Sequence, residues 1–457
     1  MELEKFFDAQ SIAIIGVSRN PNKVGHVIFR NFIDGGYNGK IFIVNPNVES
    51  ILNHHSYQSI SDIPEKIELA IIAVPAEIVP KVLEECGKKK IQNVIIVSAG
   101  FKEVGNYKLE QKLEDVIKKY KLSVIGPNSL GVFDAYSKID SLFLPRFRMS
   151  RPKEGVISFV CQSGAVGSSV VDLATAEGYG FAKFISYGNA VDIDETDLIE
   201  YLGNDDKTKV ICLYIEAVKD GRRFLEVCKN VSKKKPIIAI KGGVTEAGAK
   251  ATLSHTGSLA GSAEIYFGAF KQAGIIHAEN LEDMFDFAKI LEKCIPPKGE
   301  RLHIITNGGG YGILAVDESV KDGVKLAEFS PDIKKGLRKD LPPIINIQNP
   351  LDLAGDATSG RYKICIDACM RDKNVDVLLI IVLVQTPLIA TDIVDILIEA
   401  NDLKKKPIVV VSAGGEYTEV MRKNLEENGI PTYTYPEDAV RSIQQLVKYY
   451  KGNLKAK

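Results

Sequence analysis

Short apolar runs that end in glycine, serine, proline or asparagine recur along this sequence, and segments with helical spacing separate them. The first third contains five, at Ser11–Gly16, Ile41–Pro46, Leu69–Pro75, Val94–Gly100 and Leu122–Asn128. Apolar runs without polar alternation are typical of strands buried on both faces of a parallel sheet. Their alternation with helices predicts a doubly wound α/β fold.

The alternation of apolar runs with helical segments begins again at two later points in the chain. A second strand series begins at Gly155–Val160 and a third at Leu302–Thr306, each after a proline-bounded link. A chain of 457 residues is expected to form about three domains. The sequence therefore predicts parallel α/β domains at residues 1–145, 150–295 and 300–457.

Composition narrows the class of protein. Hydrophobic residues make up 45% and charged residues 26%, as in globular proteins, and the net charge of -1 gives no indication of nucleic-acid binding. The N-terminus lacks a signal-peptide pattern, and no apolar run reaches the ~18 residues of a membrane span. Seven cysteines without a C-x-x-C pair fit a reducing compartment. We expect a cytoplasmic protein that binds neither nucleic acid nor membrane and holds no metal.

The carboxyl ends of the first five runs should meet at one rim, where such sheets bind ligands. The G-x-G-x-x-G dinucleotide fingerprint is absent, because the glycine that follows Gly16 is Gly25. No acidic residue ends the second run, where Asn45-Pro46 stands instead, so NAD is less favoured than another nucleotide. Arg19 and Lys23 lie beside a predicted helix start that could hold phosphate. The alternative is that Gly16 serves packing alone. The predicted rim comprises Gly16, Val17, Ser18, Arg19, Lys23, Asn45, Pro46, Val74, Pro75, Ser98, Ala99, Gly100 and Phe101.

A single histidine stands among small hydroxylated residues and glycines in Lys250–Gly261. This composition predicts a loop rather than a helix interior. Neutral imidazole is nucleophilic near pH 7, so His255 is a candidate nucleophile toward phosphorus. The alternative is a loop histidine without a role.

Three further features favour a functional histidine over that alternative. Glu216 ends an apolar run and could fix the histidine tautomer, unless it is an ordinary surface glutamate. Two turns open predicted helices and offer N–H groups to phosphate. The P-loop, G-x-S-x-G and H-E-x-x-H motifs are absent. The two turns comprise Gln162, Ser163 and Gly164, and Gly308, Gly309 and Gly310.

Taken together in their order and spacing, these stretches resemble the α subunits of ADP-forming acetyl-CoA synthetases (acetate–CoA ligases), within the succinyl-CoA synthetase superfamily. The resemblance covers nearly the whole chain. It rests on Ile15–Gly25, Val124–Gly131, Gln162–Gly164, Tyr214–Glu216, Ser254–Gly261, Thr306–Gly312 and Asn349–Leu353.

The resemblance implies a Rossmann-like CoA-binding domain followed by two flavodoxin-like domains. It implies that His255 is phosphorylated, that Glu216 stabilises it, and that the rim and Asn128 contact CoA or acetyl-CoA. Acyl-CoA, phosphate and ADP would give acid, CoA and ATP through acyl phosphate and a phosphohistidine on a mobile loop. Ser129 stands where some relatives have a cysteine, so no thiol role is carried over.

No ATP-grasp stretch is recognisable in the sequence. The resemblance therefore implies a separate ATP-grasp β subunit that binds ADP or ATP with Mg²⁺, in an α2β2 heterotetramer. Two other functions stay open, an NAD(P)-dependent oxidoreductase and a CoA-sensing regulatory protein. The preferred acid, the physiological direction, the identity of the β subunit and the extent of loop movement do not follow from the sequence.

Overall fold

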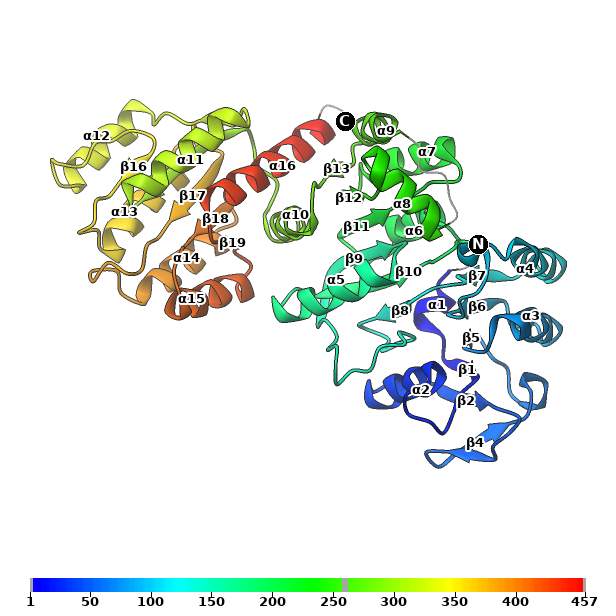
Figure 1. Cartoon of the computed structure of the whole chain (residues 1–457). Coiled ribbons are helices and arrows are strands. Elements are labelled where there is room, and N and C mark those ends of the chain that lie inside the picture. Colours follow the sequence, from blue (N-terminus) through cyan, green and yellow to red (C-terminus); the bar gives the residue numbers. More distant parts are fainter. Residues whose placement is uncertain (1–2, 257–261, 455–457) are drawn as a thin grey trace. The chain divides into compact units, whose positions relative to one another are not determined.

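A computed structural model describes residues 3–256 and 262–454, without the side chains of 252–256, 453 and 454. The described residues form three sheets with helices packed on them (Figure 1). They divide into two compact units, Met1–His277 and Ala278–Lys457, and each is described by itself. The doubly wound α/β fold predicted from the sequence is confirmed.

The first sheet has the strand order β3-β4-β2-β1-β5-β6-β7 and is parallel except for the β3–β4 pair. All five apolar runs from the first third of the chain form strands in it. The strands are β1 (Ser11–Ile15), β2 (Lys40–Val44), β3 (Ser50–Ile51), β4 (His54–Tyr57), β5 (Leu69–Ile72), β6 (Asn93–Ile96) and β7 (Ser123–Ile125). The helical segments are α1 (Lys5–Asp8), α2 (Val24–Asp34), η1 (Ile60–Asp62), η2 (Ala76–Ile78), α3 (Val79–Lys88), η3 (Lys102–Val104) and α4 (Tyr107–Tyr120).

The second sheet has the order β13-β12-β11-β9-β10-β8. It is parallel except for β8, which lies antiparallel to β10. The strands are β8 (Gly131–Asp134), β9 (Glu154–Cys161), β10 (Phe181–Ser186), β11 (Val210–Ile215), β12 (Ile237–Lys241) and β13 (Ile276–His277). The helices are α5 (Gly164–Ala176), α6 (Glu195–Asn204), α7 (Gly221–Val231), α8 (Glu246–Thr256) and α9 (Ala263–Ala273).

The third sheet, in the second unit, has the order β15-β14-β17-β18-β19, with β16 paired to β14. The strands are β14 (Arg301–Thr306), β15 (Lys325–Leu326), β16 (Leu351–Asp352), β17 (Val377–Ile381), β18 (Ile408–Val411) and β19 (Thr432–Tyr433). The helices are α10 (Leu281–Lys293), α11 (Gly309–Lys321), α12 (Pro331–Asp340), α13 (Ser359–Arg371), α14 (Asp392–Asp402), α15 (Glu416–Glu427) and α16 (Pro436–Leu454).

Alternating side chains of β1 enter different cores. Ile12 and Ile14 pack with α2, whereas Ala13 and Ile15 pack with α3 and α4 on the other face of the sheet. A strand between two helical layers has no polar face, and this explains why the run is continuously apolar. The core around Ile12 continues into Val160 and Leu213 of the second sheet, so the first two sheets share one compact unit.

Two elements cross the suggested domain limits. The strand β8 falls within residues 1–145 by sequence but pairs in the second sheet. The helix α10 falls within residues 150–295 but packs against α16 in the second unit. The exact limits of the three domains stay a prediction.

Residues 250–256 are helical, and the predicted loop is wrong for them. They form the second half of α8, while 257–261 lie outside the described residues. Three alanines between Glu246 and Ala251 favour the helix. The Thr245 hydroxyl accepts a hydrogen bond from the Gly248 N–H (3.0 Å) at its start, and Lys250 pairs with Glu246 (2.9 Å) one turn away.

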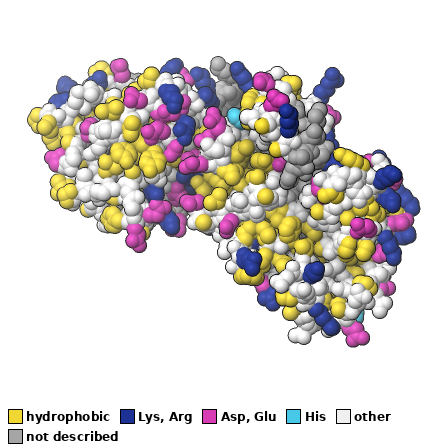
Figure 2. Space-filling model, viewed as in Figure 1, with side chains coloured by type: hydrophobic (Ala, Val, Ile, Leu, Met, Phe, Trp, Pro, Cys, Tyr) yellow, Lys and Arg dark blue, Asp and Glu magenta, His cyan; other side chains and the backbone are white. Residues whose placement is uncertain are grey.

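The surface carries both signs of charge. Lys and Arg side chains are mixed with Asp and Glu over the face in Figure 2, in keeping with the net charge of -1. Among the described residues, no helix combines the length and apolar character needed to cross a bilayer.

Candidate active site

The carboxyl ends of β1, β5, β6 and β7 are tied together by hydrogen bonds from the turns that follow them. The Asn45 amide group after β2 donates to the Val17 carbonyl (2.6 Å). The Ser98 hydroxyl donates to the Val74 carbonyl (2.6 Å), and the Asn128 N–H donates to the Ser98 carbonyl (2.9 Å). The structure therefore brings the predicted rim residues to one edge of the first sheet.

The turn between β1 and α2 combines close packing with exposed cations. A Cβ on Gly25 would lie only 2.3 Å from the Gly16 carbonyl oxygen, so this glycine lets α2 begin directly against the turn. Arg19 and Lys23 are exposed beside that helix start. Pro46, Pro75 and Ala99 are exposed on the neighbouring turns. The glycines of this turn therefore serve packing, and the exposed cations beside them still leave the turn open to a ligand.

Two rim residues belong to the core instead. The side chains of Val17 and Phe101 are 0% exposed, so a ligand at the rim can reach only their backbone. The N–H groups of Gly100 and Phe101 donate to the Glu103 carboxylate at 2.5 and 3.1 Å. The turn after β6 already holds an anion of the protein itself, and its amides are not open to a CoA phosphate.

Asn189, which follows β10, joins this turn to the second sheet. Its amide group donates to Glu103 (2.7 Å) and Glu110 (2.9 Å), and its side-chain oxygen accepts from the Asn128 amide (3.3 Å). Lys102 donates to the Asn189 carbonyl (2.6 Å) and pairs with Glu110 (3.3 Å). These contacts fix the rim against the end of β10.

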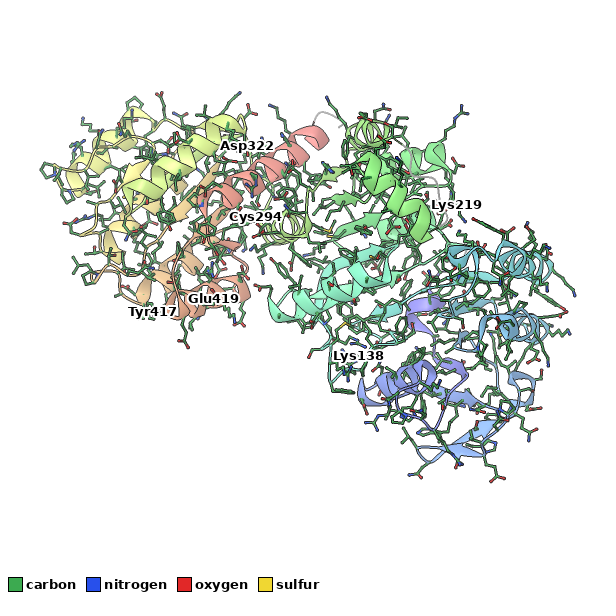
Figure 3. The ribbon with its side chains drawn as sticks, viewed as in Figure 1. Lys138, Lys219, Cys294, Asp322, Tyr417 and Glu419 are labelled. Atoms are coloured by element: carbon green, nitrogen blue, oxygen red, sulfur yellow. The ribbon has the colours of Figure 1, made fainter. Side chains whose placement is uncertain are left out.

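Burial and hydrogen bonding set the charges of this network. Burial alone would raise the pKa of Glu103, but hydrogen bonds from Gly100, Asn189 and Phe101 lower it on balance. Burial, with the nearby charge of Lys102, lowers the pKa of Lys219. Lys219, labelled in Figure 3, follows Glu216 by three residues and donates to the Ala190 carbonyl.

Glu216 directly follows β11 and is only 5% exposed, so it is not a surface glutamate. The side-chain oxygen of Gln162 accepts hydrogen bonds from the N–H groups of Glu216 (2.9 Å) and Ala217 (3.2 Å). The Tyr187 hydroxyl donates to the same oxygen (3.3 Å). Gln162, predicted to bind phosphate, therefore uses its oxygen to hold the backbone that carries Glu216.

Gly242, after β12, leaves room for Glu216. Its N–H donates to the Ile215 carbonyl (2.9 Å). A Cβ there would lie 2.6 Å from the Tyr214 hydroxyl and 3.4 Å from Cγ of Glu216. The strand ends of β11 and β12 are thus closely apposed around the carboxylate.

The start of α5 lies at the end of β9, beside Gln162. Ser163 is the N-cap, and its hydroxyl accepts from the Val166 N–H (3.4 Å). A Cβ on Gly164, the first helical residue, would meet Cβ of Leu130 at 3.7 Å, so the approach to this helix start is open. Helix starts present N–H groups that favour anions.

The helix α8, whose last turn includes His255, packs against η3. Since η3 begins at Lys102, α8 lies next to the turn after β6 and the Asn189 network. The side chain of His255 lies outside the described residues.

The second predicted phosphate turn lies in the second unit. Gly308 is the N-cap of α11, and its N–H donates to the Thr306 hydroxyl (2.9 Å). A Cβ on Gly309 would lie 2.7 Å from a carboxylate oxygen of Asp352. Gly310 is exposed. This helix start is therefore open on one side and faces a carboxylate on the other.

Sequence reasoning missed Glu103, Glu110, Asn189 and Lys241. The acidic pair on and near η3 carries no motif, and its partner Asn189 lies 86 residues away from Glu103. Lys241 gave a usable signal, because a lysine that ends an otherwise apolar run is unusual in a buried strand. No group of three or more His, Cys, Asp or Glu that could hold a metal is found among the residues the structure describes.

Comparison with protein families matches each part of the chain. A CoA binding domain matches residues 10–135, a succinyl-CoA ligase like flavodoxin domain matches 154–291, and a ligase-CoA domain matches 302–453. The alpha subunit of the ADP-forming acetate–CoA ligase II of Pyrococcus furiosus is 40% identical, with 98% of each chain covered. The alpha subunit of its ligase I is 39% identical, with 100% of each covered. The chain belongs to the family of ADP-forming acetate–CoA ligase alpha subunits.

Other relatives are longer. An ADP-forming acetate–CoA ligase of Methanocaldococcus jannaschii is 43% identical, and this chain spans only 63% of its length. Among solved structures, acetyl-coenzyme A synthetase 1 of Candidatus Korarchaeum cryptofilum, in complex with phosphate and ADP, superposes with a TM-score of 0.93. It is 34% identical, with 100% of this chain and 99% of that chain covered.

Proposed function

We propose that this chain is the subunit of an ADP-forming acyl-CoA synthetase that binds acetyl-CoA and carries the phosphorylated histidine. One observation carries the proposal. At the rim, the Asn128 amide donates to the Asn189 side-chain oxygen. Two residues before Asn189, the Tyr187 hydroxyl donates to the side-chain oxygen of Gln162, which also accepts from the Glu216 N–H. These hydrogen bonds fix the distance between the rim and Glu216. Such fixed positions suit a site in which a thioester bound at the rim reacts close to the carboxylate that orients the histidine.

The reaction has three steps. A phosphate oxygen attacks the thioester carbon, the C–S bond breaks, and CoA leaves as acyl phosphate forms. An imidazole nitrogen of His255 then attacks phosphorus, and the carboxylic acid leaves with the electron pair of the broken P–O bond. The phosphoryl group finally passes from the imidazole to the terminal oxygen of ADP, which gives ATP.

The described residues support separate roles in these steps. The exposed Arg19 and Lys23 at the start of α2 suit the phosphates of CoA. Glu216 would hold the second imidazole nitrogen as a donor and so leave the first as the nucleophile. The starts of α5 at Ser163–Gly164 and of α11 at Gly308–Gly310 would each offer N–H groups to a phosphoryl group.

The nucleotide would bind on another subunit. Relatives that match this chain end to end are named alpha subunits, which supports a separate partner. We propose an ATP-grasp β subunit that binds ADP or ATP with Mg²⁺, in an α2β2 heterotetramer. All seven cysteines have free thiols, which fits a cytoplasmic location.

Labelling tests this function. The complex with its β subunit is incubated with acetyl-CoA and labelled phosphate, and this chain should take up label that is acid-labile and base-stable, as an N–P bond requires. His255→Asn should abolish the label, whereas His54→Asn, a change at an exposed histidine in β4, should leave it intact. Label that persists in His255→Asn would refute the assignment. A wild-type chain that binds CoA but never takes up label would instead support a CoA-sensing regulatory protein.

A further inference from the structure

Lys241 is a buried cation that the proposed steps leave without a role. It is the last residue of β12 and is only 4% exposed. In the register between β11 and β12, it stands opposite Ile215, the residue before Glu216. The lysine and the glutamate thus lie on neighbouring strand ends at the same edge of the second sheet.

The contacts of Lys241 hold its ammonium group beside the segment that follows Glu216. The Nζ atom donates to the Gly242 carbonyl and lies 4.7 Å from the ring centroid of Tyr266. The Tyr266 hydroxyl in turn accepts from the Val218 N–H (2.9 Å). The ammonium therefore packs on Tyr266, and Tyr266 holds the backbone at Val218, two residues after Glu216.

The charge of Lys241 has no close counterpart among the described residues. None of their carboxylates lies within the 4.0 Å of an ion pair with its Nζ atom. Lys183, which is as deeply buried, shows the usual arrangement, with Asp134 at 3.3 Å and Asp205 at 3.0 Å. Burial lowers the pKa of Lys241, and the charge of Glu216 opposes this shift. A buried ammonium without an adjacent carboxylate is costly, which marks it as a candidate for binding an anion.

We propose that Lys241 binds the phosphate that attacks the thioester and the phosphoryl group derived from it. This inference rests on the proposed function and deepens it. Phosphate carries up to two negative charges and would react next to the negative Glu216, so it needs a fixed positive charge nearby. The helix start at Gly164 supplies only a partial charge.

The test compares Lys241→Met with wild type in the complex with its β subunit, using inorganic phosphate as the probe. Loss of a charge-assisted hydrogen bond should raise the KM for phosphate roughly 10- to 100-fold. The KM for acetyl-CoA should stay within about twofold, because the CoA rim is untouched. Lys241→Arg should recover most of the phosphate affinity. The melting temperature of Lys241→Met should not fall, because the charge removed has no adjacent carboxylate.

Lys235 provides the matched control. It lies just before β12, at the opposite end of the strand, and its Nζ atom donates to the carbonyls of Leu202 (2.8 Å) and Asp205 (2.6 Å). Lys235→Met should leave both KM values unchanged. If Lys241→Met does not fold, Lys241→Gln takes its place with the same expectation, since it keeps a donor for the Gly242 carbonyl.

Three outcomes would overturn the inference. The first is an unchanged phosphate KM in Lys241→Met. The second is a parallel rise of both KM values with a lower melting temperature, which would indicate a structural role. The third is altered product inhibition by acetate at an unchanged phosphate KM, which would assign the ammonium to the carboxylic acid. Failure of the proposed function is distinguishable, because the wild-type complex would then show no phosphate-dependent cleavage of acetyl-CoA.

Discussion

Glu216 keeps a carboxylate where water is almost excluded. Its position after β11, the hydrogen bonds from its backbone to Gln162 and the missing side chain at Gly242 all serve to hold it. Burying a charge in this way is unfavourable for stability, which fits the functional role that we propose for this residue. In the proposed mechanism, that chemistry is the orientation of the His255 imidazole.

Replacing Glu216 by Gln tests whether the negative charge of this side chain, rather than its size, is needed for turnover. The variant keeps the size of the side chain but cannot stabilise an imidazolium or fix its tautomer by charge. Turnover should fall by roughly 10- to 100-fold, the effect of losing a carboxylate partner of a histidine in metal sites. Binding of CoA, measured by titration calorimetry, should be retained. Glu226→Gln, a change at an exposed glutamate on α7, should be silent. Wild-type turnover in Glu216→Gln would contradict the pairing.

His303 in β14 should make the second unit sensitive to acid. It is 0% exposed, its ring centroid lies 4.0 Å from that of Phe329, and burial lowers its pKa from 6.5 to about 3. In the unfolded chain the histidine gains a proton below about pH 6.5, whereas the folded state excludes this proton. The contribution of neutral His303 to the free energy of unfolding is therefore complete above pH 6.5 and is lost as the pH falls toward 3.

His303→Leu should remove this pH dependence. Between pH 6.5 and 5 the free energy of unfolding of the wild type should lose about 2 kcal/mol relative to the variant. Urea unfolding of the full chain at several pH values measures the difference. His54→Leu, at an exposed position, should run parallel to wild type. Parallel curves for His303→Leu and wild type would show that His303 takes up a proton in the folded state.

At the scale of elements, the contact between α2 and β1 positions the whole turn from Gly16 to Lys23. Gly25→Ala would place a Cβ 2.3 Å from the Gly16 carbonyl oxygen and 3.1 Å from Cα of Val17, so α2 must move away. We expect a loss of about 1–3 kcal/mol in stability and weaker CoA binding. Gly336→Ala on α12, where a Cβ meets nothing within 4 Å, should be neutral or slightly stabilising. Unchanged CoA affinity in Gly25→Ala would place the ligand away from this turn.

The sequence predicts the strands better than it predicts the contacts between distant segments. The strands β1, β5 and β6 are recognisable as continuous apolar runs, because burial on both faces of the sheet leaves no position for a polar side chain. The end of α8 resembles a loop in composition, because Ser254 and the glycines at positions 257 and 261 are typical of loops, although the alanines before them favour a helix. No sequence pattern could reveal that Asn189 bonds Glu103 or that Gln162 holds Glu216, since these pairs meet only through the packing of distant strands.

At the scale of the whole molecule, the family matches divide the chain between CoA and ligase chemistry. The matched domains cover residues 10–135, 154–291 and 302–453, and none is described as a nucleotide-binding domain. The triple glycine at Gly308–Gly310 lacks the following Lys-Ser/Thr of a P-loop. The M. jannaschii relative, of whose length this chain spans 63%, has further residues outside the matched part. In the proposed function, the nucleotide site lies on a partner subunit.

The purified chain should therefore bind acetyl-CoA yet form no ATP from acetyl-CoA, phosphate and ADP. Addition of an ATP-grasp β subunit should start ATP formation, and light scattering should show a complex of larger mass. The His255→Asn chain should assemble with the β subunit equally well but stay inactive, which separates assembly from phosphoryl transfer. ATP formation by the chain alone would require a nucleotide site within its own domains, because a phosphohistidine without a bound ADP acceptor can only be hydrolysed or return its phosphoryl group.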